Sequence, residues 1–172
     1  DVVRSRGLGD VYKRQTSETF SLTPTDDSIS DINETVILTL TPISADTKLC
    51  NTPLTSSTIT IVDNEAAPTI TLAASSTSIE ENSGSSITLT ATSSIISGSD
   101  ITVSFNTSGT ATEGTDYGTI SDITISAGST TGTTTFTPTD DSMYETSTDE
   151  TATIAISTVS GGGATESGSQ SV

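Results

Sequence analysis

The sequence predicts an all-β fold, an immunoglobulin-like antiparallel β-sandwich arranged in tandem modules. Three observations predict it: Thr alternates with Ile, Val, Leu and Phe in many short segments, Gly and polar turns separate these segments, and one acidic turn occurs twice. Short strands at regular spacing without helical periodicity are typical of a sandwich, and β-branched Thr suits a half-exposed pleated surface. Composition alone would also allow a disordered Ser- and Thr-rich tract, but the alternation argues against it.

The acidic turn lies between strand-like segments in both of its copies. Residues 23–35 read TPTDDSISDINET and residues 137–151 read TPTDDSMYETSTDET. The prolines of the two copies are 114 residues apart and the matching glutamates, Glu34 and Glu150, are 116 residues apart, so the second turn is two residues longer. This period is too long for a solenoid or a propeller blade, and it suits an immunoglobulin-sized domain in tandem.

The first 15 residues differ from everything that follows. Residues 5–15, SRGLGDVYKRQ, resemble a translated sequencing adapter, so we treat residues 1–15 as an artefactual tag and exclude them from the fold prediction. A basic N-terminal arm is the alternative. Four of the five basic residues lie in this tag, and Lys48 is the fifth, in a chain of formal net charge −17. Such an acidic chain is unsuited to nucleic acid or an anionic membrane surface and favours cations.

The first module is expected over residues 16–65, as the C-terminal half of a domain. We predict a strand before its acidic turn around residues 20–22, a second strand over 36–40, and a third over 57–62. A polar connection holds Cys50, which as the single cysteine has no internal disulfide partner. Residues 66–68, AAP, read as a short hinge at the domain boundary.

The second module is expected over residues 66–172, nearly complete but lacking its last strand, whose counterpart would begin near residues 169–172. Its predicted strands span residues 69–73, 77–79, 86–92, 101–106, 120–125, 131–137 and 151–158. The predicted core contains Ile70, Leu72, Ile79, Ile87, Leu89, Val103, Phe105, Ile123, Ile125, Phe136, Ile154 and Ile156.

Clustered carboxylates in turns indicate a calcium site. Calcium takes six to eight oxygen ligands at about 2.3–2.6 Å and tolerates irregular geometry. The lack of His and the single Cys argue against zinc or copper. A lone Asp-Asp pair would more simply be a solvated turn, because Asp and Ser bond to nearby backbone amides, but its repetition on matched strands favours a metal.

Four motifs in this order resemble the Calx-beta family, calcium-binding sandwich modules found in tandem in surface and secreted proteins. They are IEENSG at residues 79–84, GTATEGTDY at 109–117, the two acidic turns, and IVDNE at 61–65. The resemblance implies seven strands in two antiparallel sheets, with calcium held by loops at one end. Tyr117 and Tyr144, which follow acidic elements, are expected to cover the rim of the sandwich.

The resemblance also implies the metal ligands, position by position. In the second module they would be Glu80 or Glu81, Asp116, Asp140, Asp141 and Glu145, with Glu150 as an outer member. In the first module they would be Asp26, Asp27, Asp31, Asp63 and Glu65. Two departures affect affinity and ion number: residues 63–65, DNE, replace an Asp-rich triplet, and residues 146–148 lengthen the second turn.

The expected function is that of a spacer in a larger extracellular or cell-surface protein, with Ca²⁺ stiffening the modules and their joint. An adhesive module that binds a glycan or a protein is the alternative. An enzyme is not expected, since without His there is no Ser–His or Cys–His pair, and a glycosidase-like carboxylate pair would lack aromatic sugar platforms. Neighbouring repeats are expected partners; nucleic acid and membrane insertion are not, since no apolar run approaches 20 residues.

Overall fold

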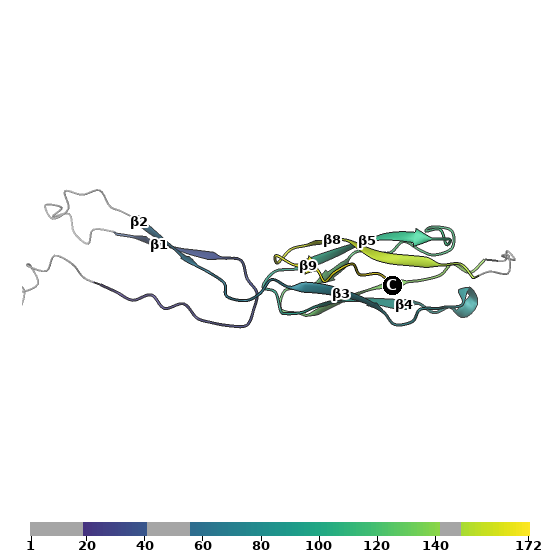
Figure 1. Ribbon diagram of the computed structural model, residues 1–172, viewed down its shortest axis with the longest axis horizontal. Helices are drawn as coiled ribbons and strands as arrows, with labels where there is room; N and C mark the ends of the chain where they lie inside the picture. The colour runs from purple at the N-terminus through teal and green to yellow at the C-terminus, as the bar shows by residue number, and fades with distance from the viewer. Residues whose placement is uncertain (1–18, 41–55, 142–148) are drawn as a thin grey trace, which may run out of the picture.

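The computed structural model describes residues 19–40, 56–141 and 149–172, which form a hairpin and a sandwich arranged end to end (Figure 1). The proposed tag, the connection containing Lys48 and Cys50, and the ligand candidate Glu145 with Tyr144 lie outside the described residues. No described helix is long and apolar enough to cross a membrane.

The sandwich consists of two sheets. The first has the order β7-β4-β3-β9 and contains β7 (Thr131–Phe136), β4 (Ile87–Ser93), β3 (Thr69–Ala74) and β9 (Thr165–Glu166). The second has the order β6-β5-β8 and contains β6 (Ile123–Ile125), β5 (Ile101–Gly109) and β8 (Ala152–Ser160). Every pair is antiparallel except β3 with β9. The all-β sandwich prediction is therefore confirmed.

The core lies between the two sheets because alternate residues of each strand point inward. In β3, Ile70 and Leu72 are buried, whereas Thr69, Thr71 and Ala73 are exposed. Of the predicted core, eight residues are buried: Ile70, Leu72, Leu89, Val103, Ile123, Ile125, Ile154 and Ile156. Ile87, Phe105 and Phe136 pack partly buried against them. The prediction missed Ala91, Ile101, Tyr117 and Ala164.

One predicted strand of the second module is wrong. Residues 77–79 form a turn instead, in which the Ser76 hydroxyl donates to the Ser78 carbonyl at 2.8 Å. The short 3₁₀-helix η2 (Glu81–Ser83) follows, and Gly84 ends it in the left-handed conformation at φ 64°. Ile79 is only half-buried and lies outside the core, contrary to the prediction. The strand expected from residue 120 begins only at Ile123.

The described part of the first module contains a two-stranded antiparallel sheet of β1 (Glu34–Thr39) and β2 (Ser56–Ile61), close to the predicted bounds. The strand expected at residues 20–22 is wrong: these residues form no strand, and Phe20 is 70% exposed. In the second module the matching strand, β7, pairs with β4. No described strand lies beside residues 20–22, and an extended segment without a ladder partner gains no strand hydrogen bonds.

The last described residues return to β8. Ile154 and Val172 exchange two backbone hydrogen bonds, each of 2.9 Å, and the Ile156 N–H donates to the Gln170 carbonyl at 3.1 Å. β9, which precedes them, was not predicted, because two residues are too few to show a period. The positions of the domain ends given above stay predictions.

Candidate metal sites

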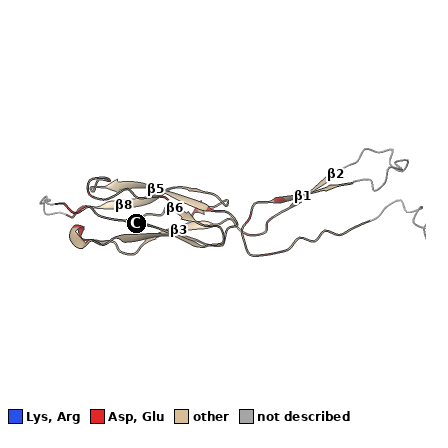
Figure 2. Ribbon diagram, turned by 180° about the vertical axis from the view of Figure 1, so that it is seen from behind, with Lys and Arg blue, Asp and Glu red and all other residues tan. Residues whose placement is uncertain are grey.

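Three acidic segments meet at the end of the sandwich that lies away from the hairpin, where parts of the ribbon are coloured red for Asp and Glu (Figure 2). The Asp141 N–H donates to Glu81 Oε1 at 2.9 Å, which joins the second acidic turn to η2. The Thr139 N–H donates to the Asp116 carbonyl at 2.9 Å, which joins the same turn to the segment after β5. The fold thus brings together the segments that the sequence separates.

Tyr117 fixes the segment of Asp116 against the second acidic turn. Its side chain is only 2% exposed, and its ring centroid lies 4.8 Å from that of Phe136 on β7. Its backbone forms an antiparallel bridge with Pro138, and the next N–H, of Gly118, donates to the Thr137 carbonyl at 3.0 Å. Tyr117 was expected to cover the rim of the sandwich; its ring instead belongs to the buried interior, packed on Phe136.

The candidate ligands of the second module share one end but differ in exposure. Asp116 and Glu81 are half-buried, whereas Glu80, Asp140, Asp141 and Glu150 are exposed. The Asp116 carboxylate accepts the Thr112 N–H at 2.6 Å, so it turns back onto its own loop. Within the described residues, no three acidic side chains are grouped closely enough to hold a metal. The donor set, all oxygens on adjoining loops, nonetheless suits calcium rather than zinc or copper.

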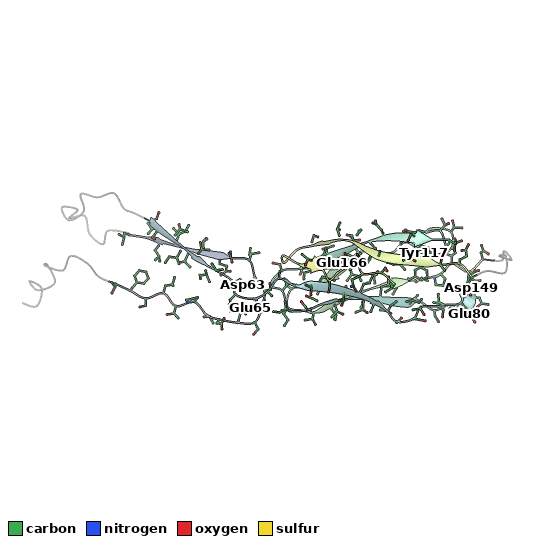
Figure 3. The ribbon with its side chains drawn as sticks, viewed as in Figure 1. Asp63, Glu65, Glu80, Tyr117, Asp149 and Glu166 are labelled. Carbon is green, nitrogen blue, oxygen red and sulfur yellow. The ribbon has the colours of Figure 1, made fainter. Side chains whose placement is uncertain are left out.

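The carboxylates of the first module lie at the joint between hairpin and sandwich, where Figure 3 labels Asp63 and Glu65. The Asp31 N–H donates to Asp63 Oδ2 at 3.1 Å, and the Asp63 N–H donates to Asn33 Oδ1 at 3.1 Å. These bonds clasp the acidic turn to the residues that follow β2. Asn33 was not among the predicted site residues, because the predicted ligands were carboxylates, whereas Asn33 is a side-chain amide that accepts a backbone N–H.

Asp27 behaves differently from its neighbours. Its Oδ1 accepts the Ile29 N–H at 2.9 Å, a local turn of the kind that short acidic side chains favour. The backbone of Asp31 and the side chains of Asp63 and Glu65 therefore meet at the joint, whereas Asp27 bonds within its own turn. Asp27 can form this bond because the Ile29 N–H lies only two residues away along the chain.

The pKa of Glu65 is raised above the usual glutamate value. The largest cause is a side-chain hydrogen bond with Asp63; loss of hydration and the negative charges of Asp63 and then Asp26 act in the same direction. All five basic residues of the chain lie outside the described part, so no described cation balances this charge. Asp26, Asp63 and Glu65 therefore form a place where positive charge is favoured.

We expect this crowding to give the metal-free chain a specific pH dependence. A raised pKa means that the folded chain binds the Glu65 proton more tightly, so the contribution is stabilising at low pH and is lost as pH rises through the raised pKa. The variant Glu65→Gln, which is always neutral, should lose this component. Side-chain NMR titration of Glu65 in chelator checks the pKa directly, and a Glu65 that titrates at or below the ordinary value would contradict the prediction.

A sandwich with acidic loops at its end, preceded by a hairpin with the same acidic turn, defines a tandem β-sandwich repeat protein. The family model described as Calx-beta domain matches residues 13–65 and again residues 63–170. The chain belongs to the Calx-beta family, whose modules are non-catalytic and associated with calcium binding. No curated protein matches the chain.

Proposed function

We propose that this chain is a calcium-binding structural unit of a larger extracellular or cell-surface protein. One observation carries the proposal: Asp63, Glu65 and Asp26 lie close enough at the joint to raise the pKa of Glu65, with no basic side chain among the described residues to balance them. Carboxylates held in this way repel one another unless a proton or a cation lies between them. A hard cation with oxygen ligands is the partner that this chemistry favours.

In the first module, Asp26, Asp31, Asp63 and Glu65 would hold the ion, with Asn33 orienting Asp63. In the second module the ligands would come from three segments: Glu80 or Glu81, Asp116, and the acidic turn with Asp140 and Asp141. Glu145 and Glu150 remain predicted members of this second site. Small rotations of exposed side chains would let these carboxylates converge, since the turns that carry them are already hydrogen-bonded together.

Calcium would stiffen the chain at two points. At the joint, an ion bound to Asp31 and Asp63 would tie the first acidic turn to the segment between β2 and β3. At the far end, an ion would tie η2, the segment of Asp116 and the second acidic turn to one another. Sites of this kind on extracellular modules typically bind calcium with Kd values of about 10⁻⁴–10⁻³ M, close to the supply outside cells.

Isothermal titration calorimetry of the full chain tests the proposal. We expect calcium to bind with a Kd no weaker than about 1 mM. Asp63→Asn should weaken the site at the joint and Asp116→Asn the site at the far end, each at least roughly tenfold, because a charged ligand is replaced by a neutral one.

A matched control is Asp122→Asn. The Asp122 carboxylate accepts the Ser104 hydroxyl at 2.8 Å beside β5, and it belongs to neither proposed site. This variant should bind calcium like the parent chain. A parent chain that binds no calcium, or an Asp122→Asn variant that loses as much affinity as the other two, would refute the proposed sites.

A further inference from the structure

Ser30, in the first acidic turn, forms hydrogen bonds with the second module through both its backbone N–H and its backbone carbonyl. Its N–H donates to the Ile96 carbonyl at 2.9 Å, and its carbonyl accepts the Gly98 N–H at 3.1 Å. Ser30 and Ser97 form a parallel bridge, and both are buried, with 5% and 2% of their surface exposed. The first module therefore pairs with the loop over residues 94–100, between β4 and β5, through backbone hydrogen bonds like those between two parallel strands.

Gly98 makes room for this contact. A Cβ at position 98 would lie 1.6 Å from Asp31 Oδ1 and 2.6 Å from Asp31 Cγ, far inside van der Waals contact. Its φ is not in the left-handed region, so the backbone conformation does not itself favour glycine. Asp31 is exposed, so its carboxylate would have to turn away before position 98 could carry a side chain. The bond from the Asp31 N–H to Asp63 holds the backbone of Asp31 beside this glycine.

The receiving loop is anchored in the sandwich. The Ser97 carbonyl accepts the Gly128 N–H at 2.9 Å, from the turn between β6 and β7, and the Ser97 hydroxyl accepts the Ser99 N–H at 3.1 Å. Nearby, the Asp100 carboxylate accepts the Ala127 N–H at 2.8 Å from the same turn. These bonds lie wholly within the second module, so they hold the loop without any group from the first module.

We propose that the loop over residues 94–100 is a docking surface for the acidic turn of the preceding module, and that Gly98 is the residue that admits it. The contact consists of two backbone hydrogen bonds of Ser30. Beside it, the lack of a Cβ at position 98 leaves space for the Asp31 side chain. The contact therefore sets the angle between consecutive modules whether or not a metal is bound. The partner that fits is a module of the same kind whose acidic turn presents a free backbone N–H and C=O followed by an Asp.

Pulsed electron–electron double resonance on the full chain, in the presence of chelator, tests this docking. Spin labels at Thr58→Cys on β2 and Ser157→Cys on β8, both exposed positions, report the distance between the modules once Cys50→Ser has removed the native thiol. The parent chain should give one narrow distance. Gly98→Val should broaden it, since loss of two backbone hydrogen bonds shifts the docking equilibrium by roughly 10- to 100-fold.

Gly118→Val is the matched control, because a Cβ there would meet only the Thr137 carbonyl, at 4.0 Å, and φ is again not positive. A rescue separates docking from misfolding: adding Asp31→Ala to Gly98→Val should narrow the distance again, because it removes the carboxylate that the larger side chain displaces. An unchanged distance in Gly98→Val, equal broadening in Gly118→Val, or no rescue by Asp31→Ala would overturn the proposal. Because chelator is present throughout, these results are independent of calcium binding.

Discussion

Replacing Tyr117 by Ala is expected to lower the free energy of unfolding of the sandwich by about 3–5 kcal/mol, the usual cost of removing a buried aromatic ring. The ring is 2% exposed and packs against Phe136 at a centroid distance of 4.8 Å. Its removal leaves a cavity at the end of the sandwich. Against a domain stability of roughly 5–15 kcal/mol, this loss would leave a marginal fold.

Urea unfolding followed by circular dichroism measures the change, and Tyr117→Phe is its control. Phe keeps the ring and its contact with Phe136, so that variant should retain most of the stability. Because the Tyr117 ring packs the segment of Asp116 against Phe136, next to the second acidic turn, Tyr117→Ala should weaken calcium binding at the far end as well. Equal stability of the Ala and Phe variants would show that the ring is not part of the core.

Calcium is expected to give the second large effect, a rise in thermal stability. A single site at 100 times its Kd adds about 2.7 kcal/mol, which for a chain of this size corresponds to a rise in Tm of about 5–10 °C. The physical reason is that the ion binds the folded arrangement of carboxylates and relieves their mutual repulsion, whereas the unfolded chain holds no such arrangement.

Melting curves in calcium and in chelator measure this shift, and magnesium serves as the control cation. Magnesium demands a nearly octahedral shell and gives up its waters reluctantly, so its effect should be smaller. Asp116→Asn should reduce the shift in the transition of the sandwich, while Asp122→Asn should leave it unchanged. Coincident curves in calcium and chelator, measured well above millimolar calcium, would contradict the structural role of the ion.

Much of the sandwich could be predicted from local alternation. In β3 and β4, Thr alternates with Ile, Leu or Ala, and the apolar residues face inward as expected. The failures share a cause. Alternation shows which side chains of a segment would lie on the same face, but it does not show whether another strand is available to pair with that segment. Residues 20–22 and 77–79 both show strand-like composition, yet neither has a described neighbouring strand, and β9, which does have one, is too short to show alternation.

The candidate ligands were predicted by residue type, but their geometry was not. Asp26 and Asp27 are adjacent and chemically identical, yet Asp27 accepts a local amide while Asp26 adds its charge to the field at Glu65. Asn33 supports Asp63 without being a carboxylate. The spacing of these residues does not distinguish an Asp that bonds within its own turn from one that faces a distant partner. Both side-chain orientations are compatible with the same local backbone.

By itself the sequence determined most of the strands, their inward faces and the repeated acidic turns, because each depends on residues that are near one another along the chain. Only the tertiary structure decided which segments meet. Asp31 reaches Asp63, Asp141 reaches Glu81, and Ser30 takes the backbone of the loop that contains Gly98. Contacts of this kind depend on how whole strands pack, and they join residues too far apart in the chain for any local period to record.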